Sequence, residues 1–433
     1  MRIFYSQLIF IFIYASILNA SPYIEFPFFF FPESPGASSI GIGGATAGSS
    51  DNSTRIYPNP GLILNEPEFS VNFKICSRNE KVRSGRYPEM YSNRITDNEI
   101  NYWGVVYPSR IFNKNMLFSI SYRTLHDFER DWFIGFNEQY FENDSVHYIQ
   151  TGGLSAISFS YCLQLFPNLF AGASLNVSKD SLSKNQWSQN YHFLSYNGEE
   201  LNREYLKKEI YTFSGQSINI GFLWRTYPTI SFGGIIKFSY TADIQHKTIS
   251  KYLLPDSDAQ IQNKNENLRM PMTYAIGVSY KYSDQLFYSM DIYYTQWNDF
   301  MYKDALGNKR SPISGKLFND SETEPTCQIR TGIEYRYINR QKEYIIPLRA
   351  GFFYDPAPTT GCPDKIWGLS LGIGLTFKHF SVDTSCQYRF GNNIGQDLFD
   401  DLNLDFSERL RELKIYTGII VYASNFFNKR SKK

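Results

Sequence analysis

The glycine-rich stretch from Gly36 to Ile63, "GASSIGIGGATAGSSDNSTRIYPNPGLI", is the first part of this sequence whose residue types suggest chemistry. A dinucleotide-binding turn needs the pattern Gly-x-Gly-x-x-Gly between a strand and a helix. Here Gly41 and Gly43 are followed by Thr46 at the third glycine position, and the stretch has no lysine for a phosphate-binding loop. The pattern argues against a nucleotide cofactor and leaves two alternatives open, a flexible linker or a packed plug.

Residues that could form a catalytic or metal-binding group are scattered. The histidines at positions 126, 147, 192, 246 and 379 have no HExxH spacing, and no GxSxG motif is present. The five cysteines, at positions 76, 162, 327, 362 and 386, form no CxxC pair and are best interpreted as isolated small apolar residues. We therefore expect no enzymatic activity, no metal and no cofactor.

Charge and aromatic content narrow the class of protein. The 43 basic and 42 acidic residues nearly cancel, which gives no reason to expect a nucleic-acid partner. The 33 Tyr and 36 Phe are typical either of a large core or of aromatic girdles at two membrane–water interfaces. A mean hydropathy of −0.36 excludes a membrane protein of many helices but not a barrel, whose strands hide half their residues from lipid.

The first twenty residues have the pattern of a secretory signal peptide. Arg2 precedes an apolar run from Leu8 to Leu18, and Ala20 offers a cleavage point before Ser21. The run is shorter than the ~20 apolar residues that a membrane span needs. A short anchoring helix is the alternative interpretation.

Apolar and polar residues alternate with period two along most of the remaining chain, which predicts β-strands. In the segment 366–377, large apolar residues from Trp367 to Phe377 alternate with glycine, serine and threonine, which favours a wall with something packed close behind it. The predicted strands are 68–77, 101–109, 115–125, 148–165, 168–178, 208–225, 229–242, 269–282, 285–297, 326–338, 343–354, 366–377, 379–390 and 411–423.

The connections between these fourteen segments alternate between short turns and long polar stretches. The long ones are 78–100, 126–147, 179–207, 243–268, 298–325, 355–365 and 391–410. An up-and-down barrel of the bacterial outer membrane has this property, and its strand number is even. Because every backbone amide must be paired in hydrocarbon, a closed sheet is the solution open to strands. We predict an all-β fold: a transmembrane antiparallel β-barrel of 14 strands.

The same alternation assigns a set of charged residues to the barrel interior. Basic residues facing lipid at the bilayer midplane would cost ~2–4 kcal/mol each, so the charges are expected in the lumen. The set is Lys74, Arg123, Lys237, Lys281, Asp291, Arg330, Glu334, Arg336, Arg349, Asp383 and Arg389.

Several motifs, in the expected order, resemble the FadL family of outer-membrane transporters for hydrophobic compounds. Asn59, Pro60, Gly61 and Leu62 resemble the hatch motif Asn-Pro-Ala-Gly-Leu, with its alanine missing. Further matches are Pro271, Gly277, Tyr294, Thr295 and Trp297, then Arg-x-Gly-x-Glu-Tyr from Arg330 to Tyr335, and finally Leu348, Arg349, Gly351, Tyr354, Asp355 and Pro358. The likeness covers nearly the whole mature chain.

The resemblance implies a domain order and a mechanism. A signal peptide (1–20) would precede a hatch that plugs the lumen (21–66), the barrel (67–424) and a basic tail (425–433). In the family an outer groove captures an apolar ligand, a pocket holds it against the hatch, and an inward kink of strand three opens the wall. The segment 115–125 contains no glycine or proline, so the sequence gives no sign of that kink.

The resemblance also implies a function: passive uptake of hydrophobic molecules such as long-chain fatty acids across the bacterial outer membrane. Candidate ligand-binding residues are Arg349, Lys237, Arg330, Trp187 and Phe193; an internal ion pair to Glu334 is the alternative role for Arg349. Other functions left open are a structural anchor or shuttle in a secretion or surface-attachment machine, and a porin for small polar solutes. Expected partners are a hydrophobic small molecule and outer-membrane lipid, with no nucleic acid, and the chain is expected to be a monomer.

Overall fold

The computed structural model describes residues 36–49, 59–62, 66–84, 87–135, 145–182, 185–197, 200–396 and 407–423. The expected signal peptide and basic tail lie outside this part of the chain. The helical elements within it are α2 (Ala37–Gly41) and the 3-10 turns η2 (Trp297–Asp299) and η3 (Phe318–Asp320). No helix in the described residues is long and apolar enough to cross a membrane.

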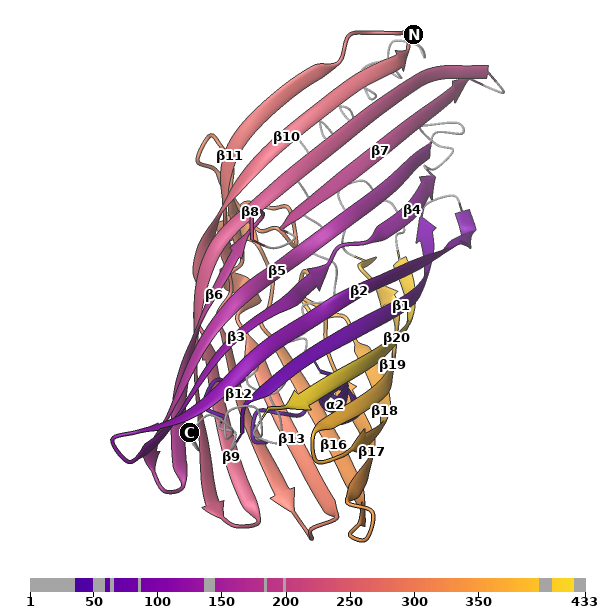
Figure 1. Ribbon diagram of the computed structural model, residues 1–433. Coiled ribbons are helices and arrows are strands. Elements are labelled where there is room, and N and C mark those ends of the chain that lie inside the picture. Colours follow the sequence, from indigo (N-terminus) through magenta and orange to yellow (C-terminus); the bar gives the residue numbers. More distant parts are fainter. Residues whose placement is uncertain are drawn as a thin grey trace.

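Strands make up nearly all the rest of the described chain (Figure 1). Their bounds are β1 Glu68–Ser84, β2 Tyr87–Ile111, β3 Lys114–Asp127, β4 Arg130–Gly135, β5 Ser145–Phe166, β6 Leu169–Lys179, β7 Gln186–Asn197, β8 Glu200–Tyr227, β9 Ile230–Lys237, β10 Tyr240–Leu254, β11 Gln260–Met270, β12 Thr273–Lys281, β13 Leu286–Thr295, β14 Met301–Lys303, β15 Lys309–Arg310, β16 Thr326–Asn339, β17 Tyr344–Tyr354, β18 Ile366–Thr376, β19 Phe380–Ile394 and β20 Ser407–Tyr422.

These strands close into an antiparallel barrel of 14 strands. The ring runs β1, β2, β3, β5, β6, β8, β9, β12, β13, β16, β17, β18, β19 and β20, and β20 pairs back with β1. Closure gives every strand of the ring a paired neighbour on both sides, as a strand-built membrane protein requires. The prediction of the fold and of the strand number is confirmed.

Outward positions on the ring carry large apolar side chains, and inward positions carry small or polar ones. On β18, Leu371 and Ile373 are exposed on the outside, whereas Ser370 is buried on the inside. Outward apolar residues recur around the ring, including Phe73, Phe159, Ile218, Ile276, Tyr288 and Ile419. Such a belt is the surface that a lipid bilayer covers.

The barrel wall extends beyond this belt at one end, where β7, β8, β10 and β11 form a tall flap (Figure 1). There many outward residues are polar, for example Thr212, Gln245 and Asn265, and they break the apolar belt. The prediction of long loops at 78–100, 179–207 and 243–268 is wrong, because most of these residues continue as paired strands.

Candidate functional site

The N-terminal hatch lies inside the barrel, and its described residues are buried. One of its contacts is with Asp291, on the inner face of β13. One carboxylate oxygen, Oδ2, accepts hydrogen bonds from the backbone N–H groups of Thr46 (2.6 Å) and Ala47 (2.7 Å). Charge-assisted hydrogen bonds of this kind are short and strong. The sequence placed Asp291 in the lumen but did not identify it as the hatch receptor.

Side chains on three further strands hold the remainder of the hatch. Arg330 on β16 donates to the carbonyl of Gly43 at 3.1 Å, and Ser370 on β18 accepts from the N–H of Gly43 at 2.9 Å. Ser385 on β19 donates to the carbonyl of Ala37 at 2.6 Å. Arg330, proposed from the sequence as a ligand residue, thus contacts the hatch directly.

The four-residue hatch motif is seated against the opposite wall. The amide of Asn59 donates to the carbonyl of Ala47 (2.7 Å) and to that of Phe222 on β8 (2.9 Å), while its oxygen accepts from the N–H of Gly61 (2.9 Å). The Asn59 side chain therefore ties the motif both to the hatch and to the wall. Leu62 is fully buried in an apolar cluster with Val106, Leu117, Cys162, Phe170 and Leu223.

A ring of inward-facing glycines makes room for the hatch. A methyl group on Gly351 would lie 2.1 Å from the backbone nitrogen of Gly43, and one on Gly233 would lie 1.7 Å from the carbonyl of Ala47. Cross-strand register sets these glycines opposite other glycines, because Gly351 pairs with Gly332 and Gly233 pairs with Gly277. Other wall glycines in contact with the hatch are Gly172, Gly221, Gly277, Gly332 and Gly372.

Above the hatch the lumen has two unlike sides. The side formed by β1, β16, β17, β19 and β20 is ionic. Glu412, for example, lies within ion-pair distance of Arg78 (3.6 Å), Arg389 (3.5 Å) and Lys414 (3.3 Å). All four side chains are almost completely buried. The interior placement of Lys74, Arg123, Asp291, Arg330, Glu334, Arg349, Asp383 and Arg389, predicted from alternation, is confirmed.

The opposite side of the lumen is apolar and aromatic. Its cluster comprises Phe128, Leu154, Trp187, Tyr211, Phe213, Ala242, Ile244, Leu268, Met270, Trp297, Phe300 and Tyr302. Trp187, a predicted ligand residue, stacks on Tyr211 with ring centroids 4.9 Å apart and meets Phe128 edge-on at 5.3 Å. This cluster is larger than the apolar cluster of Phe353, Ala357, Ile366, Ile394 and Leu410 on the ionic side, so it offers a hydrophobic molecule more matching surface.

An aromatic row continues from this cluster along the inner face of the flap. Phe193, the other aromatic candidate, lies half-buried on β7 between Tyr191 (6.3 Å) and Tyr205 (5.8 Å). Tyr205 in turn contacts Tyr252 at 5.0 Å. The capture segment predicted as a loop is therefore a strand hairpin that carries its aromatic side chains on a regular surface.

The two remaining candidates, Arg349 and Lys237, have different surroundings. Arg349 pairs with Glu334, Nε to Oε2 at 2.6 Å, and with Asp383, so it has the internal ion pair considered as its alternative role. Lys237 ends β9 on the inward face, and the positive charges of Arg123 and Arg330 act on it. Lys237, Arg123 and Arg330 are therefore three basic residues close to one another on the lumen side, and Arg330 also lies 3.8 Å from Asp355.

The buried histidine His246, on β10, lies in the flap, outside the membrane belt. Its ring stacks on Tyr211 at 4.2 Å, and its nitrogens lie 3.0 Å from Glu266 and 3.5 Å from Glu209. Burial disfavours the charged ring of His246, but hydrogen bonds to Glu209 and Glu266 outweigh it and raise the pKa of His246 above its ordinary value. Lys207 pairs with Glu209 at 2.9 Å and belongs to the same group.

The wall is broken beside strand three, which the sequence did not indicate. The β2–β3 ladder ends at the pair Tyr102–Arg123, β3 stops at Asp127, and β4 resumes at Arg130. The cause lies on the neighbouring strand: a methyl group on Gly153 would lie 2.5 Å from the carbonyl of His126, and Gly152 has a φ of +114°. These β5 glycines let β3 bend inward.

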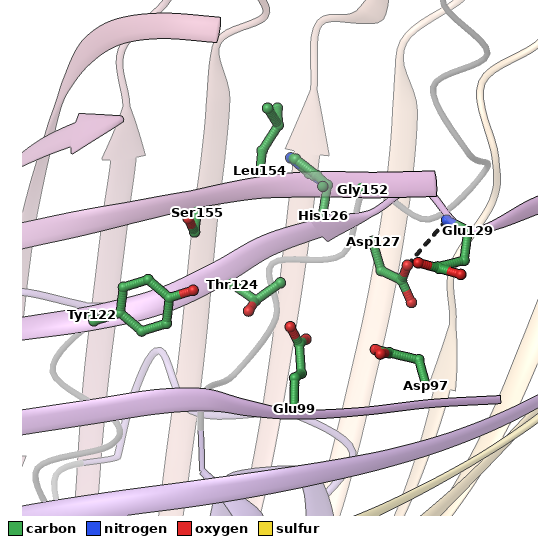
Figure 2. A pocket seen from close by; sticks show the side chains of 11 residues that line it. Asp97, Glu99, Tyr122, Thr124, His126, Asp127, Glu129, Gly152, Leu154 and Ser155 are labelled. Atoms are coloured by element: carbon green, nitrogen blue, oxygen red, sulfur yellow. Dashed lines mark hydrogen bonds between the residues drawn. The ribbon is translucent and has the colours of Figure 1, made fainter. Parts of the chain in front are cut away.

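A small pocket marks this break (Figure 2). Asp97 and Glu99 come from β2, and His126 and Asp127 come from the end of β3. Figure 2 shows Asp127 accepting a hydrogen bond from the backbone N–H of Glu129, at 3.1 Å. Leu154, of the apolar lumen cluster, also lines the pocket, so the break connects with the apolar side of the lumen.

The fold and the lumen together define the class: a barrel of the outer-membrane type, closed from within by its own N-terminal hatch. Solved structures share this fold. A FadL homologue of Pseudomonas aeruginosa has a TM-score of 0.62 at 12% identity, over 91% of this chain and 99% of that chain. The toluene transporter TbuX of Ralstonia pickettii has a TM-score of 0.57 at 14% identity, over 89% of this chain and 98% of that chain. The monoaromatic hydrocarbon channel CymD has a TM-score of 0.57 at 16% identity, over 89% of this chain and 97% of that chain. No family model and no curated protein matches the chain.

Proposed function

We propose that the chain is a FadL-like transporter of the bacterial outer membrane that takes up hydrophobic small molecules. The observation that carries this proposal is the lumen itself, in which a docked hatch forms the floor beneath a continuous apolar cluster on one side. A water-filled pore for polar solutes would have no use for that surface. An apolar solute gains ~0.8 kcal/mol for each CH₂ group that it removes from water.

The arrangement supports a route in three steps. The aromatic row around Phe193 and Tyr205 captures the molecule outside the membrane. The cluster around Trp187 and Phe213 then holds it above the hatch. The break between β2 and β3, next to Leu154, offers a way out through the wall into the bilayer.

Long-chain fatty acids are the substrate class that we favour. Their chain suits the apolar cluster, and their carboxylate suits the basic residues Lys237, Arg123 and Arg330. A neutral aromatic hydrocarbon would bind the apolar cluster but would leave the basic residues without a role.

Native mass spectrometry of the mature protein in mild detergent tests this function. We expect co-purified apolar adducts, and binding of added oleate at micromolar concentration, both weakened when residues 21–61 are removed. Protein that binds neither fatty acids nor toluene, and that passes no ions in planar bilayers, would contradict transport and favour an anchoring role. Steady ion conductance by the intact chain would favour a porin instead.

A further inference from the structure

The break in the wall has two edges, and each carries a β-bulge at the same level. On β2 the register with β1 shifts at Asn101, between the pairs Asn72–Tyr102 and Phe73–Ile100. On β3 the register with β5 shifts at Leu125. Bulges bend strands and end pairing. Beyond this level residues 91–100 pair with β1, and among the described residues no ladder joins them to β3 or β4.

One side chain reaches both edges of this gap. The ammonium group of Lys74, on the inner face of β1, lies 2.6 Å from Glu99 and 3.3 Å from Asp97 on the β2 edge. It also lies 3.7 Å from Asp127 on the β3 edge. The Lys74 side chain has no exposed surface. A charge that is desolvated in this way depends on its partners, and they depend on it.

The strand beyond the gap is fastened from within by the next residues of the same β1 face. Trp132 on β4 donates from its ring nitrogen to Glu80 at 2.7 Å, and Arg130 pairs with the same carboxylate. Arg78 donates to the carbonyl of Glu129. Because β2 lies between β1 and β3 in the wall, these side-chain contacts reach from β4 to β1 on the lumen side of β2. Lys74 is the member of this series that bridges the gap itself.

We propose that Lys74 is an ionic latch that holds the β2 and β3 edges of the wall gap together. With the ammonium in place, its attraction draws Asp97 and Glu99 on one edge toward Asp127 on the other. Without it, the attraction that draws Asp97 and Glu99 toward the β3 edge is lost, while Arg78 and Lys414 continue to act on Asp127, and the like charges on the two edges repel each other. The latch itself is a property of the wall. Its consequence, that a molecule leaves sideways only when the latch opens, rests on the proposed function.

Pulsed electron paramagnetic resonance on the full mature chain in nanodiscs tests the latch. Spin labels are placed at Asn98 on β2, which is exposed, and at Asp131 on β4, with the exposed Cys327 and Cys362 changed to serine. In Lys74→Met we expect the label-to-label distance to lengthen by several ångströms. Lys74→Arg keeps the cation and is expected to keep the original distance. Lys207→Met, a buried lumen lysine paired with Glu209 on β8, is the matched control and is expected to leave the distance unchanged.

The outcomes separate the latch from the transport proposal. An unchanged distance in Lys74→Met would overturn the latch. An equal lengthening in Lys74→Arg would overturn it too, because packing rather than charge would then hold the gap closed. If Lys74→Met fails to fold, Glu99→Gln removes the nearest partner and is expected to give a smaller lengthening; no change there would overturn the latch as well. Oleate binding is measured on the same samples. Its absence in the wild-type chain would contradict the transport function and leave the distance result standing.

Discussion

Replacing Asp291 by asparagine should undock the hatch from the barrel wall. The amide keeps the shape of the side chain and one acceptor oxygen but loses the negative charge. In the native chain a single carboxylate oxygen accepts two backbone N–H groups, at 2.6 and 2.7 Å. In one orientation of the asparagine amide, its oxygen accepts both N–H groups, but the bonds are neutral instead of charge-assisted. In the other orientation, an NH₂ group faces the two N–H groups and neither bond forms.

The magnitude follows from these two bonds. A hydrogen bond to a charged group contributes about 1.5–3 kcal/mol and a neutral one about 1 kcal/mol, so weakening both bonds costs about 1–4 kcal/mol of docking free energy, or about 2.5 kcal/mol in the middle of that range. At 1.4 kcal/mol for each factor of ten, the population of undocked hatch rises about a hundredfold. The contacts of Arg330, Ser370 and Ser385 stay in place and keep the hatch from leaving altogether.

Hydrogen–deuterium exchange of the hatch in nanodiscs measures this change. We expect the amides of Thr46 and Ala47 to exchange about a hundredfold faster in Asp291→Asn, in line with the lost docking energy. Asp383→Asn is the matched control, because Asp383 is also a buried lumen carboxylate but pairs with Arg349. Equal exchange in the Asp291 variant and the wild type would refute the assignment of Asp291 as the hatch receptor.

Three further predictions concern other contacts. Gly351→Ala places a methyl group 2.1 Å from the backbone nitrogen of Gly43 and should destabilise hatch docking by about 1–3 kcal/mol. Hydrogen–deuterium exchange measures this as faster exchange of residues 41–44. Exchange at the wild-type rate would show that the wall can shift to admit the methyl group. Lys237→Met should weaken oleate binding about tenfold and leave toluene binding unchanged, measured by calorimetry; an equal loss for both ligands would point to a packing role. The raised pKa of His246 stabilises the flap in full below pH about 6.5, and this contribution is lost as the pH rises through the raised value. The protection of β10 and β11 amides, which is their exchange rate corrected for the base-catalysed intrinsic rate, should therefore fall from pH 6 to pH 9 in the wild type but not in His246→Gln. Protection that does not change with pH in the wild type would contradict the ion pairs with Glu209 and Glu266.

The membrane part of the barrel was predictable because lipid imposes a strict alternation on each strand. Outward residues such as Leu371 and Ile373 had to be apolar, and their inward neighbours were free to be small. The flap lacks this constraint. There Lys207 and Glu209 point inward while Lys208 and Ile210 point outward, so polarity does not alternate and the segment resembles a loop. Its strands are fixed by backbone pairing with β7 and β10, which residue types do not encode.

The wall break was missed because its cause lies on a different strand from its effect. The sequence of β3 holds no glycine or proline before the bend, and the expectation drawn from residues 115–125 alone was that no kink is indicated. The bend is permitted by Gly152 and Gly153 on β5, whose missing side chains let the carbonyl of His126 approach. Paired strands share their irregularities, so a glycine pair inside one strand pattern is evidence about its neighbours as much as about itself.

The same principle accounts for the hatch. Glycines that weaken each separate strand would be costly if the lumen behind them were empty, since glycine gives up side-chain packing and chain entropy. In register they form one continuous surface, in which Gly172 faces Gly221, Gly233 faces Gly277, and Gly277 stands next to Asp291. A Cβ atom would collide with the hatch backbone at Gly172 and Gly233, with the Asn59 side chain at Gly221, and with the Asp291 side chain at Gly277. The stability that these glycines cost the separate strands is therefore offset by the packing of the hatch against the wall. The positions of the wall glycines determine where the hatch can bind, as the residues of the hatch do.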